Sequence, residues 1–262
     1  PKMLDLMLSC TRGCSRPSGP AMRLVRPSST LTRPSSALQA MPLFFNDHYE
    51  VPLPAGHRFP MAKYALVRRG LEKELAPRGL ASFHPSPLAT LDELTTTHTR
   101  EYVASYLENR LTPEENRRVG FPWSRASVER SLSSTGGTIA ATRLVCERPN
   151  TRLAGHLAGG THHAFADRGE GYCVFNDIAV AARVALRDYP SVISRVLIVD
   201  LDVHQGNGCA ALFADEPRVT TLSVHCESNF FSARQTSDVD VEVPAGAGDD
   251  AYLALLRQTL AP

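Results

Sequence analysis

The fold of this chain is decided by the stretch Ile198-Val199-Asp200-Leu201-Asp202-Val203-His204-Gln205-Gly206-Asn207-Gly208. Its apolar beginning predicts a short buried strand, and the polar residues and glycines after it predict a loop. Open α/β sheets bind their ligands in the loops that follow the strands. Two carboxylates and one imidazole within five residues are costly to bury without a partner, and a bound cation is a favourable partner. The stretch therefore predicts a strand end that carries a metal site.

The second half of the chain alternates between strand and helix. Apolar runs predict strands at residues 151–157, 195–200, 219–225 and 239–243, and helical spacing predicts helices at 178–186, 210–213 and 249–260. Earlier, helical spacing covers residues 61–75, 92–108 and 124–146, and a strand-like segment begins at Phe44. This alternation predicts an α/β fold in which a doubly wound, mostly parallel sheet has helices on both faces. Gly136 and Gly137 predict close packing of the 124–146 helix, because glycine costs a helix about 1 kcal/mol relative to alanine.

Composition separates a basic N-terminal segment from the rest of the chain. The 262 residues carry a net charge of +1 and are 43% hydrophobic, which is typical of a globular protein. Residues 1–41 hold six of the 28 Lys and Arg residues but one of the 27 Asp and Glu residues. We predict that residues 1–41 are a disordered extension or an organelle transit peptide, and that residues 42–262 form the folded domain. The alternative is an unstructured leader or a misassigned gene start.

The charge balance and the cysteines narrow the class of protein. Without residues 1–41 the chain is mildly acidic, which argues against direct nucleic-acid binding. No apolar run reaches the roughly 18 residues that span a bilayer, so we expect no membrane partner. The six scattered cysteines favour a reducing, intracellular location. This would be a mitochondrion or chloroplast if the leader is a transit peptide, and the nucleus or cytoplasm otherwise. Cys10 and Cys14 alone are weak evidence for zinc.

Asp202 and His204 are the candidate metal ligands. Side chains two residues apart on an extended segment point to the same side, so this pair can present an oxygen and a nitrogen to one ion. Both donors suit zinc. Asp200, two residues earlier on the same side, is better placed to support the site or to bind another cation. The alternative is a polar strand end with solvated side chains.

Two further segments contain candidate site residues. His162 and His163 directly follow Gly159-Gly160-Thr161 in another predicted loop, and a neutral imidazole can act as a general base near pH 7. Asp200 and Asn207 are candidates to orient the two rings. In residues 169–177, glycines let the backbone approach a ligand and Tyr172 could form one wall of a channel. The alternatives are ordinary loop histidines and a tight loop that enters a helix.

Together these segments resemble the histone deacetylase family, zinc-dependent amidohydrolases with an arginase-like fold. The resemblance is carried by residues 159–163, 171–177, 199–208, 222–227 and 244–250, in this order. Residues 57–61 and 121–124 are similar to the bacterial and plant branch. Gln205-Gly206-Asn207 stands in place of the commoner His-Gly-Asp and resembles class IV members.

The resemblance implies a role for each matching residue. Asp202 and His204 would bind zinc, His163 would be the general base, and His162 would be its partner, oriented by Asp200. Asn207 stands where many relatives have an Asp that orients the second histidine. The substrate channel would be lined by Gly171, Tyr172, Phe230 and Phe231. A structural monovalent cation, potassium, would be held by Asp200 and Ser223.

The implied function is zinc-dependent hydrolysis of an acyl-lysine amide in a protein or peptide such as a histone. One alternative is an amidohydrolase that acts on acetylpolyamines or other small molecules. A non-catalytic binding protein and, less favoured, a bimetallic ureohydrolase of the arginase type are the others. The family's third zinc ligand, an Asp, and its oxyanion-stabilising Tyr have no counterpart before Pro262. We therefore expect residues 42–262 to be about the first two thirds of the catalytic domain, with the last part of the sheet missing and catalysis incomplete.

Overall fold

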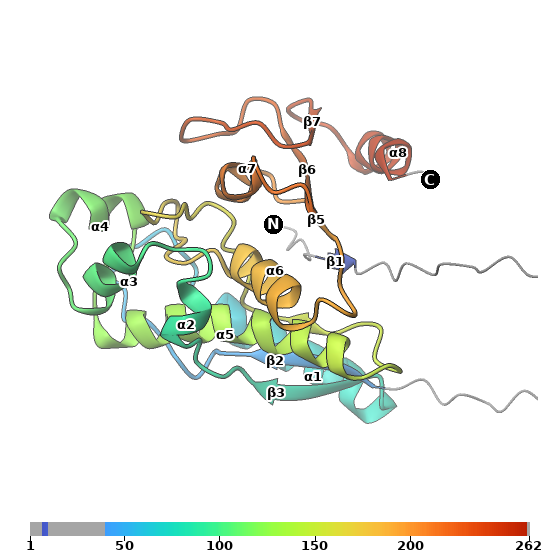
Figure 1. The fold of residues 1–262 in the computed structure, drawn as a ribbon, viewed down its shortest axis with the longest axis horizontal. Helices are drawn as coiled ribbons and strands as arrows, with labels where there is room; N and C mark the ends of the chain where they lie inside the picture. Colours follow the sequence, from blue (N-terminus) through green and yellow to red (C-terminus); the bar gives the residue numbers. More distant parts are fainter. Residues whose placement is uncertain (1–6, 10–39, 261–262) are drawn as a thin grey trace, which may run out of the picture.

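The strands of the computed structural model, which describes residues 7–9 and 40–260, form two sheets (Figure 1). In the first, β5 (Val196–Asp200), β6 (Val219–Cys226) and β7 (Val239–Val243) are parallel, and β1 (Met7–Ser9) pairs antiparallel with β5. In the second, β2 (Met41–Phe45) lies between β3 (Ala81–Pro85) and β4 (Gly155–His156), all parallel. The predicted α/β class with mostly parallel strands is confirmed.

Helices α5 (Arg125–Glu147) and α6 (Asp177–Asp188) lie between the two sheets (Figure 1). The α6 helix is rich in Ala and Val, and residues 177–186 except Arg183 are buried, as expected for a helix inside a layered core. Val180 and Val184 on one side pack in the same cluster as Phe175 and Tyr106. Ala179, Ala182 and other residues on the opposite side pack against Ile198 of β5. The α6 helix therefore joins the two halves of the molecule.

The glycine pair in α5 confirms the predicted close packing. A Cβ atom on Gly136 would lie 2.1 Å from the carbonyl oxygen of Pro87, in the segment after β3. On Gly137 it would lie 2.5 Å from Nε2 of His156, on β4. Because both neighbours approach the helix backbone directly, larger side chains are excluded from this side of α5.

The other helices are shorter or lie nearer the surface. Helix α4 was not predicted, although Thr112 and Glu115 form its capping box and Pro113 is its first residue, and both signals are readable in sequence. Strand β3 was not predicted either, the strand expected at 151–157 is limited to β4, and Phe44 lies near the end of a strand rather than at its beginning. Within the described residues, no helix is long and apolar enough to cross a membrane. The remaining helical elements are α1 (Lys63–Leu75), η1 (Ala76–Arg78), α2 (Leu91–Leu94), α3 (Arg100–Leu107), α4 (Pro113–Val119), α7 (Asn207–Phe213) and α8 (Asp249–Thr259).

The loops after β4 and β5 meet in front of α6. The backbone N–H of Cys209 donates to the carbonyl of His162 at 3.2 Å, and the side chain of Asn176, at the start of α6, donates to the carbonyl of Ala164 at 3.0 Å. Two segments with candidate site residues are thereby held together. Of the predicted extension 1–41, residues 7–9 form β1 and residues 40–41 lead into β2, and the rest lies outside the described residues.

Candidate active site

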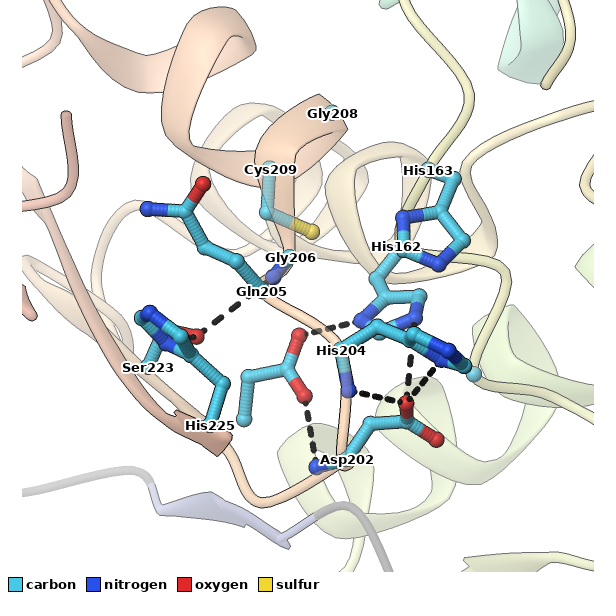
Figure 2. Close-up of polar contacts among 12 residues, drawn as sticks. His162, His163, Asp202, His204, Gln205, Gly206, Gly208, Cys209, Ser223 and His225 are labelled. Carbon is cyan, nitrogen blue, oxygen red and sulfur yellow. Dashed lines mark hydrogen bonds and ion pairs between the residues drawn. The ribbon is translucent and has the colours of Figure 1, made fainter. Parts of the chain in front are cut away.

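His162, in the loop after β4, forms a buried pair with Asp200, the last residue of β5. Figure 2 shows the ring of His162 beside His163 and His204. Nδ1 of His162 lies 2.5 Å from Oδ2 of Asp200, and the other carboxylate oxygen accepts a hydrogen bond from the backbone N–H of Asp202 at 3.0 Å. Burial lowers the pKa of His162, but the charge of Asp200 and its hydrogen bond outweigh burial and raise that pKa to about 9. His162 is therefore a cation held against a carboxylate.

His163 is in the opposite protonation state from its neighbour. Its Nδ1 lies 2.8 Å from Oδ1 of Asn207, the first residue of α7, and that amide oxygen also accepts from the backbone N–H of Gly208 at 3.0 Å. Burial, and then the positive charge of His162, lower the pKa of His163 to about 3. Because the amide oxygen can only accept, Nδ1 carries the proton and Nε2 has the free lone pair.

Asp202 and His204 lie beside the histidine pair and are partly exposed. Oδ1 of Asp202 accepts from the backbone N–H of His204 at 2.8 Å and lies 3.1 Å from its Nδ1. The same oxygen is 3.9 Å from Nε2 of His162. Burial acts to raise the pKa of Asp202, but the hydrogen bond from His204 and the charge of His162 hold it well below its ordinary value.

Asp202 and His204 offer donor atoms that suit a zinc ion, but they are only two. A carboxylate oxygen and an imidazole nitrogen are both usual zinc ligands, and catalytic zinc sites usually have three protein ligands. Across residues 7–9 and 40–260, no third His, Cys, Asp or Glu joins this pair in a group that could hold a metal. The described chain thus supplies two donors of such a site.

Phe230 and Phe231 cover one side of the histidines. The ring of Phe231 is almost perpendicular to that of His163, with centroids 4.9 Å apart, and lies 5.7 Å from that of His204. The Phe230 ring lies 6.0 Å from His163. Gly171 faces this group at a φ of +56°, and a Cβ atom there would lie 2.5 Å from Phe231 and 2.9 Å from His163. Only glycine fits between the two rings.

Tyr172 belongs to a neighbouring aromatic group. Its ring packs against Phe59 at 5.0 Å and Phe121 at 5.1 Å, with His57 at 6.0 Å. His57, Phe59 and Phe121 lie within the sequence patterns at 57–61 and 121–124, but these patterns did not indicate that the three residues belong to the site. A role of Tyr172 in lining the channel stays a prediction.

Ser223 lies next to Asp200 on the adjoining strand. The two residues are paired in the register of β5 and β6. The hydroxyl of Ser223 lies 3.0 Å from Nδ1 of His225 and accepts from the backbone N–H of Gly206 at 3.4 Å. A potassium ion held by Ser223 and Asp200 stays a prediction.

Asp177 supports the turn before the histidine pair, a role that the sequence motifs do not indicate. Its carboxylate accepts from the backbone N–H groups of Gly160 at 3.1 Å and Thr161 at 2.7 Å. It also accepts from the hydroxyls of Thr161 at 2.6 Å and Thr138 at 2.5 Å. In the sequence, Asp177 is only the last residue of the segments 169–177 and 171–177, and nothing there links it to the turn before His162. A carboxylate is favoured at the start of a helix, so the position of Asp177 at the start of the predicted helix was the sequence signal that could have drawn attention to it.

Comparisons with known proteins show what this chain is similar to. Residues 57–262 match the family described as the histone deacetylase domain. An uncharacterized protein of Picosynechococcus sp. is 42% identical over 219 residues, which are 84% of this chain and 71% of that protein. Histone deacetylase 2 of Arabidopsis thaliana is 40% identical over 128 residues, 48% of this chain and 32% of the relative. The crystal structure of an HDAC homolog from Aquifex aeolicus superposes with a TM-score of 0.69 at 25% identity, covering 84% of this chain and 64% of that one.

Proposed function

Because the chain belongs to the histone deacetylase domain family, we propose that it takes part in deacetylase-type hydrolysis of an acyl amide. The observation that carries the proposal is the pair His162 and His163. Asp200 holds the first as a cation, while burial and the charge of His162 keep the second neutral. Asn207 fixes the tautomer of this neutral ring, and the pair lies directly beside Asp202 and His204. A proton acceptor next to a positive charge suits attack of water on a carbonyl carbon.

We propose zinc as the cofactor, with Asp202 and His204 as two of its ligands. When bound, zinc would polarise the substrate carbonyl and lower the pKa of a bound water toward about 7. Since the described residues offer two of the usual three ligands, we expect this segment alone to bind zinc more weakly than a complete site would. The chain spans 64% of the solved relative and 32% of the plant deacetylase, so the activity proposed is that of the whole protein.

The histidines divide the proton transfers between them. Nε2 of His163 accepts a proton as the water oxygen bonds to the carbonyl carbon. The imidazolium of His162 provides positive charge beside the oxygen that becomes negative. When the carbon–nitrogen bond breaks, the leaving amine takes up a proton from the histidine pair. Asn207 keeps His163 in the tautomer that this sequence requires.

An acylated lysine side chain in a protein or peptide is the proposed substrate. Gly171 and Phe231 lie in close contact beside His163, so a bulky group has no space at this point. A relative carries the name histone deacetylase, which supports histones among the candidates. Acetylpolyamines have an equally slender chain and are the second substrate class to test.

The proposal is tested by a substrate panel on the full-length protein. Peptides with acetyl-lysine and long-chain acyl-lysine, together with acetylpolyamines, should identify the substrate class, and we expect acetyl-lysine to be hydrolysed. His163→Ala should lower kcat by about 10²–10⁴-fold. Unchanged turnover in this variant would refute the assigned base, and hydrolysis of none of the substrates would refute the function. Independently of activity, Asp202→Ala should lower the amount of zinc bound per chain.

A further inference from the structure

Gln205 makes an extensive set of hydrogen bonds to a distant loop. It follows His204 directly, but its buried side chain extends away from His162 and His163 (Figure 2). Its Nε2 donates to the carbonyl of Gln235 at 2.6 Å, and its Oε1 accepts from the backbone N–H of the same residue at 3.0 Å. Nε2 also donates to Oδ1 of Asp240 at 2.8 Å. One side chain thereby pairs both backbone groups of Gln235, as a neighbouring strand would.

The loop that Gln205 holds, residues 227–238, carries Phe230 and Phe231. The rest of the loop is attached mainly to its own β6–β7 unit. Asp238 accepts from the backbone N–H of Thr221 at 2.7 Å, and Arg234 donates to the carbonyl of Cys226 at 3.1 Å. The link from Asn207 to the carbonyl of Ala233 is long, at 3.5 Å. Gln205 is thus the strongest hydrogen-bonded connection described between this loop and the segment with His204 and Asn207.

We propose that Gln205 is a positioning residue that sets the width of the substrate entrance by fixing the 227–238 loop, an inference that rests on the proposed hydrolysis. The ring of Phe231 lies against His163, and its edge reaches the position that a side chain on residue 171 would take. A displacement of the loop moves this ring relative to Gly171 and therefore changes which substrate side chains can pass. Gln205 itself touches none of the reacting groups.

The amide is the chemical group that this position needs. Gln205→Glu places a carboxylate oxygen opposite the carbonyl of Gln235 and the carboxylate of Asp240, where the wild type has an N–H donor. The result is repulsion between acceptors and the loss of two hydrogen bonds. Gln205→Met keeps the length of the side chain and removes its donor and acceptor. Both changes free the loop without altering the histidines, Asp202 or His204.

The test uses two measurements on the full-length protein and its Gln205→Glu and Gln205→Met variants. The first is hydrogen exchange at the backbone amide of Gln235. The second is the ratio of kcat/KM for two acetylated peptides, of which one carries an acetyl-lysine and the other a methyl branch next to the acetamide nitrogen. The matched control, Gln258→Glu, makes the same chemical change at an exposed position on α8.

We expect exchange at Gln235 to rise about tenfold in both Gln205 variants. The preference for the linear substrate should fall about tenfold, because the branched substrate gains access. The control should match the wild type in both measurements. If Gln205→Glu does not fold, Gln205→Met carries the same test.

Two results would overturn the inference: unchanged exchange at Gln235, or an equal loss of kcat/KM for both peptides with an unchanged ratio. The second result would mean that Gln205 is merely structural. Hydrolysis of neither peptide by the wild type would instead overturn the proposed function and the selectivity role with it. The exchange measurement would still decide whether Gln205 fixes the loop.

Discussion

His163 donates its Nδ1 proton to the amide oxygen of Asn207 across 2.8 Å, so a neutral side chain decides which nitrogen of the histidine can accept a proton. Asn207→Ala removes this acceptor and lets the other tautomer form. We expect kcat/KM to fall by about 10–100-fold, the usual cost of losing a residue that orients a catalytic ligand or base. Steady-state kinetics on the hydrolysed substrate measures this. Asn207→Asp, which keeps an acceptor, should retain more activity than Asn207→Ala, and the reverse order would contradict the assigned role.

We expect Asp177 to stabilise both the turn before His162 and His163 and helix α6, which begins at this residue. Asp177→Asn replaces one accepting oxygen by a donor that faces the donors of Gly160, Thr161 or Thr138. We expect the free energy of unfolding to fall by about 1–3 kcal/mol and kcat to fall together with it. Asp188→Asn, at the other end of α6, removes only ion pairs at a partly exposed site and should cost less than about 1 kcal/mol. Equal losses in the two variants, measured by chemical denaturation, would argue against a special role of Asp177.

Gly136→Ala should destabilise the protein, although alanine is the better helix former. The new Cβ atom would lie 2.1 Å from the carbonyl oxygen of Pro87, which is backbone and cannot rotate away. We expect a loss of about 1–3 kcal/mol in the free energy of unfolding, typical of overpacking. Gly70→Ala in α1, where nothing lies within 4 Å of the added atom, should be stabilising by up to about 1 kcal/mol. Stabilisation by Gly136→Ala would show that α5 and the segment after β3 are not packed as described.

His98 should make the protein less stable in acid. Its Nδ1 donates to the carbonyl of Phe165 and its Nε2 accepts from the backbone N–H of Asn176, both at 2.9 Å, so the folded protein needs the neutral ring. Burial lowers the pKa of His98 to about 4, against about 6.5 in an unfolded chain. As the pH falls below 6.5, the unfolded state binds a proton that the folded state does not, and stability is lost until about pH 4. This amounts to on the order of 3 kcal/mol.

The measurement for His98 is the free energy of unfolding at several pH values between 4 and 8. His98→Gln should reduce the steepness of the acid loss by about one proton relative to the wild type. A variant with the same pH dependence as the wild type would show that His98 is not held neutral by Phe165 and Asn176. Other buried histidines, such as His156, whose pKa burial also lowers to about 4, would then account for the slope.

The elements that local sequence predicts well are those whose burial pattern is regular. Helices α5 and α6 and strands β5 and β6 lie within a few residues of the predicted ranges, because apolar spacing over a dozen residues reports directly on burial. Strand β3 escaped prediction because it is short and has no continuous apolar run, although Ser82 and His84 alternate with apolar residues as in a half-buried strand. The division of the strands into two sheets could not be predicted from the sequence. It depends on which strands pair once α6 is packed between them.

Sequence by itself determined the family to which the chain belongs and indicated the candidate donors of the site. Asp202 and His204 share one side of a strand end because the repeat of an extended chain is local. The sequence also named Asp200 and Asn207 as candidates to orient His162 and His163, but only the tertiary structure showed which atoms meet and that Gln205 reaches a distant loop. His162 pairs with Asp200 across 38 residues and His163 with Asn207 across 44, and Gln205 reaches Gln235 across 30. Such bonds depend on the relative position of loops that α6 brings together. Packing sets that position, and no local pattern encodes it.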